Sequence, residues 1–219
     1  MTTNAPAAPP ASAPKRMAPT RRREHLIDVA ASLYATVPFD QVSVDDITEA
    51  AGVSRALFYR YFAGPREIFV ATTQVIVDGL LTHFHNVPHD MPLLEQLRQA
   101  LTTFMDLAQE YSQCYIALMR NPSVQTTTGA GTIIDEVRAE SVREMQDRLG
   151  IPEAPRIVQV TLKSWLLVVE NTVLEWLSSD DLPREGLDDL LIAQLLGMGL
   201  ATADLEPEVS ARIMSALSS

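Results

Sequence analysis

The run SRALFYRYF, which begins at Ser54, carries side chains that can hydrogen-bond to a nucleic acid. Arginine can donate a bidentate pair to a guanine edge, and the hydroxyl groups of serine and tyrosine can bond to phosphate oxygens. Arg55 and Arg60 supply the guanidinium groups, while Tyr59 adds a second hydroxyl. The small Ala56 would let the backbone of such a helix come close to DNA. This set predicts a DNA-reading helix, and the alternative is a surface helix with ordinary exposed polar residues.

A second group of potential ligands is a cluster of three histidines, His83, His85 and His89, followed by Asp90. Imidazole and carboxylate groups bind transition metals, so a metal-responsive regulator is an alternative that we keep. Positions 83 and 85 lie on different faces of a regular helix, so joint ligation would require the helix end to unwind. Histidines near a helix C-terminus also complement the helix dipole while they stay in solvent. We therefore assign no metal ligand.

The sequence contains no recognisable catalytic arrangement. There is no nucleophile elbow with a Ser-His-Asp set, no GxGxxG segment and no phosphate-binding loop. The single cysteine, Cys114, has no evident base nearby in the sequence and excludes a disulfide framework. We expect neither catalytic residues nor a cofactor, and a helical enzyme is the least favoured alternative.

Hydrophobic periodicity predicts three short helices around this run. The first, over 22–36, has an amphipathic stripe made of Leu26, Ile27, Ala30, Leu33 and Tyr34. Ser43 can cap a second helix over 44–51, and Ser54 can cap a third over 55–62. The tight turn between them, Gly52-Val53-Ser54, gives a helix–turn–helix.

The third of these helices has two distinct faces. Phe58 and Phe62 lie four residues apart, so they share one side, which we assign to the core. Tyr59 and Arg60 then point outward, and Leu57 lies at the edge between the two faces. The outward face is the one that we expect to meet DNA.

Composition divides the 219-residue chain into parts. Apolar residues make up 47% and charged residues 21%, which suits a globular protein. Residues 15–66 hold eight basic and six acidic side chains, whereas residues 67–219 hold nine and twenty-two, so the charge is +2 in one part and −13 in the other. We predict a disordered Ala/Pro-rich arm over 1–20, a mildly basic domain over 21–65 that contains the helix–turn–helix and so should bind DNA, and an acidic domain over 66–219.

The chain shows no obvious targeting signal. No apolar run reaches the roughly 18 residues that span a bilayer. The N-terminus also lacks the apolar segment of a secretion signal. We expect a cytoplasmic protein with no membrane partner.

The segment from Arg23 to Phe69 resembles the DNA-binding domain of the TetR (tetracycline repressor) family. The resemblance is carried by Ala30, Tyr34, Phe39-Asp40, Ser43-Val44-Asp45-Asp46-Ile47, Ala50-Ala51-Gly52-Val53-Ser54, Phe58-Tyr59, Tyr61-Phe62 and Glu67-Ile68-Phe69. It implies an all-α fold in which a three-helix helix–turn–helix domain precedes a helical domain that binds an effector and forms a homodimer. It also implies that the following positions approach bases or backbone: Ser54, Arg55, Ala56, Leu57, Tyr59 and Arg60.

The resemblance implies phosphate contacts at two further positions. Ser43 looks like the family's cap of the second helix, and Tyr61 stands where the family often has His or Tyr at a phosphate. Three residues depart from the family pattern: Pro38, Leu57 and Pro65. Pro65 replaces a lysine that commonly contacts phosphate, and Arg66 is the candidate to replace that contact.

Beyond Pro65 the pattern is helical throughout. We predict helices over 66–84, 92–111, 112–120, 131–149, 155–178, 187–203 and 207–217, with a mobile loop over 121–131. The helix over 155–178 is apolar nearly all round, so its own subunit and a partner should both cover it. With the helix over 187–203 it is predicted to form a four-helix dimer interface through Trp165, Val169, Val173, Trp176, Leu191, Leu195, Gly197 and Gly199. A monomer with a large core is the alternative.

A mostly apolar effector pocket is expected near these helices. Its predicted lining is Phe104, Met105, Tyr111, Tyr115, Met119, Trp165 and Asn171, residues that could equally belong to the core. We hypothesise a repressor whose two recognition helices enter major grooves about 34 Å apart on a palindromic double-stranded DNA operator. A small apolar effector would change that spacing and release the DNA.

Overall fold

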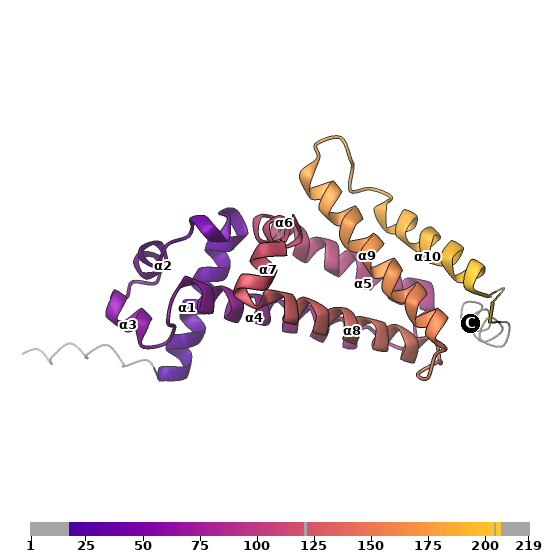
Figure 1. Ribbon diagram of the computed structural model, residues 1–219, viewed down its shortest axis with the longest axis horizontal. Helices are drawn as coiled ribbons and strands as arrows, with labels where there is room; N and C mark the ends of the chain where they lie inside the picture. Colours follow the sequence, from indigo (N-terminus) through magenta and orange to yellow (C-terminus); the bar gives the residue numbers. More distant parts are fainter. Residues whose placement is uncertain (1–17, 121, 204, 207–219) are drawn as a thin grey trace, which may run out of the picture.

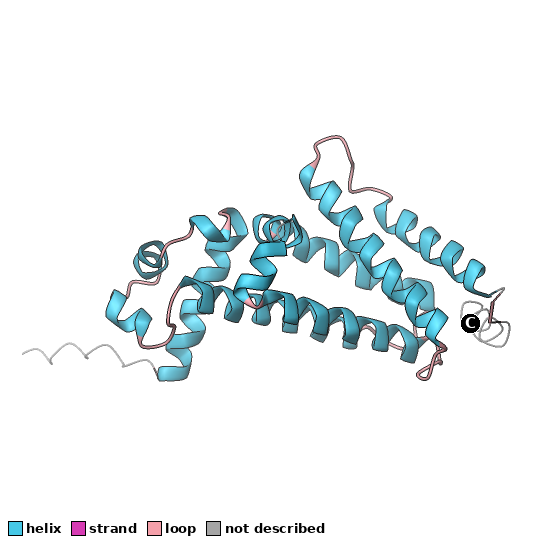
Figure 2. Ribbon diagram, in the orientation of Figure 1, coloured by secondary structure: helices cyan, strands magenta, loops and turns pink. Residues whose placement is uncertain are grey.

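The computed structural model describes residues 18–120, 122–203 and 205–206. Every regular element in those residues is a helix, which confirms the all-α fold (Figures 1 and 2). The elements are α1 (Pro19–Thr36), η1 (Phe39–Gln41), α2 (Val44–Ala50), α3 (Arg55–Tyr59), α4 (Pro65–His85), α5 (Leu93–Glu110), α6 (Ser112–Arg120), α7 (Pro122–Thr128), α8 (Ala130–Arg148), α9 (Arg156–Ser178) and α10 (Leu187–Ala203).

Helices α1 to α3 form a small unit at one end of the elongated molecule (Figure 1). Its core consists of side chains that are at most 3% exposed: Leu26, Ile27, Ala30, Tyr34, Ile47, Phe58, Phe62, Ile68 and Phe69. The Tyr34 ring stands edge-on to Phe69, with ring centroids 5.4 Å apart. Most of the amphipathic stripe predicted for the first helix is therefore buried, because it packs against aromatic residues of the following elements.

Helix α4 connects this unit to the rest of the molecule. It starts at Pro65, whose fixed φ suits the first turn of a helix. Its 21 residues correspond to about 30 Å. Ile68 and Phe69, near its start, belong to the N-terminal core, whereas Leu80 and Phe84, near its end, face a cavity in the second unit. One continuous helix therefore reaches both units.

The second unit is built around α9, which contacts α5, α6, α8 and α10. Its core includes Met105, Trp165, Val173 and Leu191, each at most 2% exposed. The Trp165 indole Nε1–H donates to the Leu191 carbonyl at 2.9 Å and so ties α9 to α10. These two helices run side by side at the end of the molecule opposite α2 and α3 (Figure 1).

Three boundaries differ from the predictions. Helix α1 begins at Pro19, inside the arm predicted over 1–20, and α3 ends at Tyr59 rather than at residue 62. The loop predicted over 121–131 contains α7. The rest of the arm and the helix predicted over 207–217 lie outside the described residues.

The junction after α7 explains why the loop prediction failed. The Thr128 hydroxyl donates to the Val124 carbonyl at 2.6 Å and accepts from the Ala130 N–H at 3.2 Å. Gly129, with φ 87°, then turns the chain directly into α8. Short side-chain-to-backbone bonds of this kind leave no hydrophobic periodicity in the sequence.

Helix α9 has the length and composition of a membrane-spanning segment, with 23 residues and a mean hydropathy of 1.3. Its sequence alone predicts no such segment. In the structure its inward side chains, Trp165, Val169 and Val173, pack against α5 and α10. One side of α9 is therefore part of the core, while only 28% of its most apolar 18-residue window is buried.

Candidate nucleic-acid interface and internal cavity

Serine caps and one glycine shape the helix–turn–helix. The Ser43 hydroxyl accepts from the Asp46 backbone N–H at 3.2 Å, and the Asp46 carboxylate accepts from the Ser43 N–H at 2.8 Å. This is a capping box, and its hydrogen bonds hold the pKa of Asp46 below its ordinary value. Ser54 caps α3 by accepting from the Leu57 N–H at 3.2 Å. Gly52, at φ 64°, makes the turn between the two helices.

Helix α3 presents one face to solvent and the other to the core. Phe58 is completely buried and Phe62 is 1% exposed, whereas Tyr59 is 49% exposed. Leu57 is half-buried at the edge. The exposed residues of this segment include four that were expected to approach DNA: Arg55, Ala56, Tyr59 and Arg60. The structure thus brings them together on one open surface.

Arg55 has a partner that DNA could replace. Its guanidinium group lies 3.0 Å from the Asp45 carboxylate, and both side chains are more than half exposed. The pKa of Arg55 is raised by the Tyr59 hydroxyl and by the Asp45 charge. An exposed ion pair of this kind adds little stability. Arg55 can therefore exchange Asp45 for a phosphate or a guanine edge at little cost.

The remaining predicted DNA contacts occupy three different environments. The Ser43 hydroxyl is used by the helix cap, although the residue is exposed. Tyr61 is half-buried and packs against the N-terminal core. Arg66 is exposed beside Pro65, and neither it nor Arg60 forms an ion pair with another described residue. Among the predicted DNA contacts, Arg60 and Arg66 are thus arginines free to take phosphate.

Sequence reasoning missed two side chains of α1 that support this surface. The Arg23 guanidinium lies 5.1 Å from the centroid of the Phe62 ring, a cation–π contact. His25 Nε2 hydrogen-bonds with the Ala51 carbonyl at 3.2 Å. The basic cluster at the start of α1 was a visible signal for Arg23, but its position over Phe62 depends on the tertiary structure.

The second unit contains a partly open, apolar cavity of about 410 Å³. Helices α4, α5, α8, α9 and α10 all contribute to it, with apolar side chains such as Leu97, Leu101, Phe104, Leu162, Trp165 and Leu196. The volume lies in the range typical of small-molecule sites. The cavity is therefore the candidate effector site.

The structure corrects most of the predicted pocket. Phe104 and Trp165 do line the cavity. Met105 is completely buried in the core, and Asn171 is exposed on the other side of α9. Of the residues expected from the segment around α6, Tyr111 and Met119 pack against the N-terminal core, and Tyr115 packs in the second core. These three residues are not in the lining because α6 packs against α1 and α9, although the Tyr115 ring lies 5.9 Å from the ring of Phe104, which does line the cavity.

Tyr115 instead connects α6 to α9. Its hydroxyl donates to the Glu170 carbonyl at 3.0 Å. Burial, together with the Glu170 charge, raises the pKa of Tyr115 well above its ordinary value. The residue therefore remains a neutral hydrogen-bond donor that holds the two helices together.

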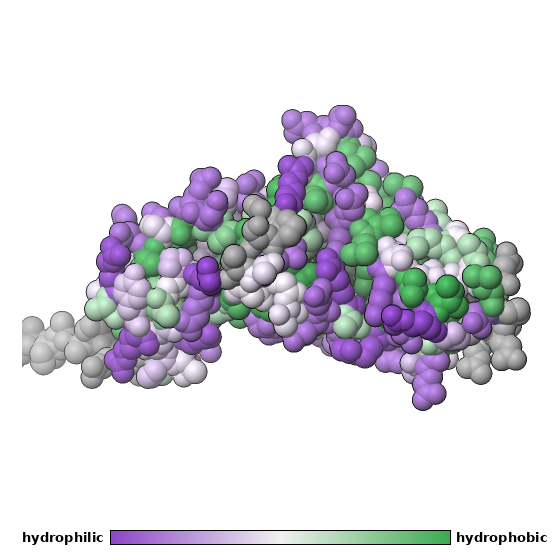
Figure 3. Space-filling model, in the orientation of Figure 1, coloured by the Kyte–Doolittle hydropathy of each residue, from purple (hydrophilic) through white to green (hydrophobic). Residues whose placement is uncertain are grey.

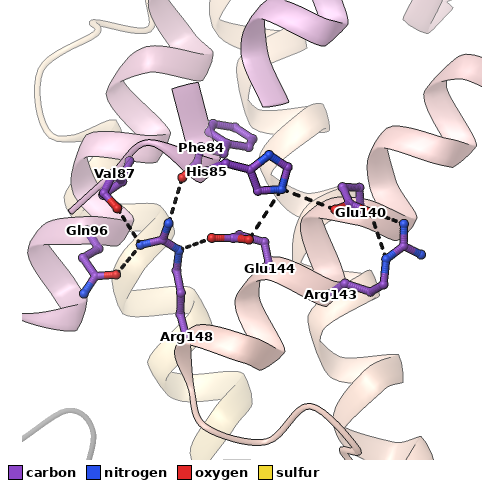
Figure 4. A network of polar contacts seen from close by, with 8 residues as sticks. All are labelled: Phe84, His85, Val87, Gln96, Glu140, Arg143, Glu144 and Arg148. Carbon is purple, nitrogen blue, oxygen red and sulfur yellow. Dashed lines mark hydrogen bonds and ion pairs between the residues drawn. The ribbon is translucent and has the colours of Figure 1, made fainter. Parts of the chain in front are cut away.

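Four of the five charged residues on the cavity wall are paired with one another. The Arg138 guanidinium donates twice to the Glu170 carboxylate, at 2.8 and 2.6 Å. Arg148, only 9% exposed at its side chain, donates to Glu144 at 2.6 Å and to the Gln96 amide oxygen at 2.5 Å. Figure 4 shows that Arg148 also reaches the end of α4, through the carbonyls of Phe84 and Val87, at 2.8 and 3.2 Å.

The histidine cluster does not form a metal site in the described residues. His85 lies 3.3 Å from Glu140 and 3.6 Å from Glu144 of α8 (Figure 4). His83 and His89 are exposed. In the part of the chain that the structure describes, no three His, Cys, Asp or Glu side chains are placed to hold one metal ion. Burial raises the pKa of the Cys114 thiol to about 12, which makes it a poor ligand and nucleophile.

The predicted dimer interface also needs correction. Five of its residues are core residues of this chain, at most 9% exposed: Trp165, Val169, Val173, Trp176 and Leu191. They face α5 and α10 of the same subunit. Leu195 and Gly199 are half-buried, while Gly197 is exposed. Of the predicted set, only these three remain available to a partner.

Two sequence profiles match the chain. The profile described as "Bacterial regulatory proteins, tetR family" matches residues 26–72, and "Tetracyclin repressor-like, C-terminal domain" matches residues 93–198. A crystal structure of a tetR-family transcriptional regulator from Streptomyces coelicolor matches with a TM-score of 0.86 and 31% identity, over 92% of this chain and 90% of that chain. The chain belongs to the TetR family. The resemblance seen in the sequence is thereby confirmed.

Curated TetR-like relatives show similarity over shorter stretches. The HTH-type transcriptional activator FasR of Mycolicibacterium smegmatis is 24% identical over 168 residues, which is 75% of this chain and 76% of FasR. The candidate mycofactocin biosynthesis transcriptional regulator MftR of Mycobacterium tuberculosis is 39% identical over 83 residues. That match covers 36% of this chain and only 40% of MftR. As a TetR-family member, the chain is a DNA-binding transcriptional regulator and not an enzyme, as predicted.

Proposed function

We propose that this regulator binds a palindromic operator as a homodimer and that a small, mostly apolar effector releases it. The observation that carries the proposal is the reach of α4. Its first turns pack in the core beneath α3, and its last turns line the cavity through Leu80 and Phe84. A ligand that fits one position of this helix better than another shifts the population of the DNA-binding form. Coupling of about 1–3 kcal/mol is typical of such systems.

The DNA-binding role of particular residues follows from the exposed surface of α3. Arg55 and Arg60 supply bidentate donors for guanine edges, and Tyr59 supplies a hydroxyl for the backbone. Arg66, at the start of α4, supplies the phosphate contact for which Pro65 has no side-chain donor. Two copies of this surface would enter successive major grooves about 34 Å apart. Such a protein acts where the operator DNA is, which we take to be the cytoplasm.

Dimerisation would use the outward face of α9 and α10. Large apolar side chains are exposed there: Ile157 at 37%, Val160 at 43%, Leu167 at 52%, Leu190 at 46% and Leu200 at 61%. Figure 3 shows apolar side chains gathered over these two helices, whereas the surface around α2 and α3 is mostly hydrophilic. A Cβ added at Gly197 would meet nothing within 4 Å in this subunit. The glycine therefore leaves room for close approach of a partner helix.

A gel-shift assay with the intergenic DNA upstream of the gene tests the proposal. Wild type should give a sequence-specific shift that weakens when a cavity ligand is added. The double variant Tyr59→Ala, Arg60→Ala should lose the shift, while Arg156→Ala, an exposed arginine at the far end of the molecule, should keep it. If the double variant gives an undiminished shift, α3 is not the helix that reads the DNA. A reporter gene downstream of the same DNA would then distinguish repression from activation.

A further inference from the structure

The cavity is elongated. Its wall extends from Val137 to Leu149 on α8 and from Val158 to Glu170 on α9, which corresponds to about 18 Å along each helix. A sphere with the cavity's volume of 410 Å³ would be only about 9 Å across. A chain-like molecule therefore fits this space better than a compact one.

The charges on the wall leave no free cation for an acid. Two arginines, Arg138 and Arg148, and three glutamates, Glu144, Glu170 and Glu206, line the cavity, so its formal charge is −1. Arg138 is held by Glu170 and also by Asp135, at 3.0 Å. Four donor contacts of Arg148 are already used. An ionised carboxylate would enter a net negative wall without an unpaired partner, at a high desolvation cost.

A cation is also poorly served inside the cavity. The carboxylates of Glu144 and Glu170 each accept from an arginine that lies on the same wall. Glu206, the third acid, has no ion-pair partner among the described residues, but it follows the end of α10, beyond Ala203, rather than lying in the middle of the wall. An ammonium group in the interior would have to displace an arginine from its carboxylate. An uncharged ligand avoids both costs.

Among the uncharged polar side chains of the wall, one lacks a partner in the described residues. Ser141 is 8% exposed and lines the cavity from α8, between Arg138 and Glu144. Its hydroxyl forms no hydrogen bond with another described residue. By contrast, the Thr161 and Thr202 hydroxyls are 2.6 Å apart and also bond to helix carbonyls. A hydroxyl both donates and accepts, so Ser141 can meet a hydroxyl or a carbonyl of a ligand.

We infer that the effector is an uncharged, elongated, mostly aliphatic molecule whose hydroxyl or carbonyl group bonds to Ser141. The inference rests on the proposed function, because it assigns a chemical class to the effector of the same site. It excludes free fatty acids and alkylammonium ions of the same length as preferred ligands. Paired charges and one free hydroxyl together set this preference.

The experiment uses the full chain and an uncharged fluorescent dye, N-phenyl-1-naphthylamine, as the displaced probe. At neutral pH, 1-decanol should displace the dye with an affinity at least about tenfold higher than that of decanoate or decylammonium. Ser141→Ala should lower the affinity for 1-decanol by about threefold to tenfold and leave the affinity for decanoate unchanged. Glu170→Gln removes the carboxylate that pairs with Arg138, so it should raise the affinity for decanoate by about fivefold or more. The matched control Glu175→Gln, an exposed glutamate on the same helix, should behave like wild type.

Several results would overturn the inference. If decanoate or decylammonium binds wild type as tightly as 1-decanol does, the cavity accepts a charged ligand. If the dye does not bind, the cavity is not a ligand site. If Ser141→Ala binds 1-decanol as wild type does, Ser141 does not hydrogen-bond to the ligand. If circular dichroism shows Glu170→Gln to be unfolded, the inference is tested by the relative affinities of the three ligands for wild type and by the effect of Ser141→Ala. The gel shift without ligand tests DNA binding separately. A wrong effector class can therefore be distinguished from a failure of the DNA-binding proposal.

Discussion

Arg148 shows how one buried side chain holds several helices. The last carbonyls of a helix lack partners within that helix. Arg148, on α8, donates to the Phe84 carbonyl near the end of α4 and to the Val87 carbonyl just beyond it, while Gln96 brings in α5. Its charge is balanced by Glu144, which is 18% exposed at its side chain. The residue therefore fixes the cavity end of the helix that leads to the DNA-binding unit.

Replacement of this arginine should be costly. Arg148→Ala is expected to lower the free energy of unfolding by about 3 kcal/mol, because Glu144 and the carbonyls lose their shared donor. Arg143→Ala, on the same helix, removes a 62% exposed side chain that pairs with Glu140, so it should cost less than about 1 kcal/mol. Urea denaturation of both variants measures the difference. Equal losses would contradict the role assigned to Arg148.

The capping box of α2 predicts a pH dependence. The folded pKa of Asp46 is lowered by its hydrogen bonds with Ser43, so the stabilisation is present above the unfolded pKa of an aspartate, about 3.9. It is lost as the pH falls through the lower folded pKa. Asp46→Asn should therefore show a smaller loss of thermal stability between about pH 5 and pH 3 than wild type. Asp180→Asn, at an exposed loop residue, serves as the control and should follow the wild-type curve.

At the scale of elements, α2 and α3 are too short to be stable alone, with seven and five residues. Their serine caps stabilise each helix start, and buried side chains such as Ile47 and Phe58 pack them into the core shared with α1 and α4. The turn between them depends on Gly52, whose φ of 64° is unfavourable for residues with a Cβ. The position of the reading helix is therefore set by local geometry at its start and by core packing beneath it.

Two glycine-to-alanine changes should have opposite effects. Gly52→Ala is expected to destabilise the fold by about 1–2 kcal/mol, because alanine resists the left-handed conformation. Gly79→Ala, inside α4, should stabilise it by about 1 kcal/mol, because alanine favours helix and a Cβ there meets nothing within 4 Å. Thermal unfolding of the two variants and of wild type measures whether each change raises or lowers the stability of the fold. A stabilising Gly52→Ala would show that the turn is made differently.

At the scale of the whole molecule, the two functional surfaces lie at opposite ends. Helix α3 exposes polar and basic groups at one end, and α9 with α10 exposes apolar groups at the other (Figures 1 and 3). A contiguous apolar surface on a soluble regulator indicates a protein partner. The outward residues Ile157, Val160 and Leu167 recur at spacings of three and seven along α9, as a helix–helix seam requires.

A charge in this seam should separate the proposed dimer. Leu167→Glu is expected to raise the dimer dissociation constant by at least about 30-fold, because the carboxylate would be buried without a partner. Val75→Glu, at a 51% exposed residue of α4, changes the same kind of surface elsewhere and should leave the dimer intact. Sedimentation velocity at micromolar concentration reports both. Wild type sedimenting only as a 24.1 kDa species would remove the dimer proposal itself.

The sequence by itself determined the helix–turn–helix, because its signals are local. Ser43 and Ser54 mark helix starts, Gly52 marks the turn, and Phe58 and Phe62 identify the inward face. Each of these depends on residues no more than four positions apart, so no knowledge of the rest of the chain is needed. The same pattern carried the resemblance to the TetR family.

Only the tertiary structure decided the cavity and the free surface of α9. That helix is apolar nearly all round, so its periodicity cannot show which face its own subunit covers. Packing against α5 and α10 turned Trp165 and Val173 inward and left Leu167 outside. The position of α6 likewise kept Tyr111 from the cavity, while α4 and α8 brought Ser141 to it. These choices arise from contacts between residues far apart in the chain, which local patterns do not encode.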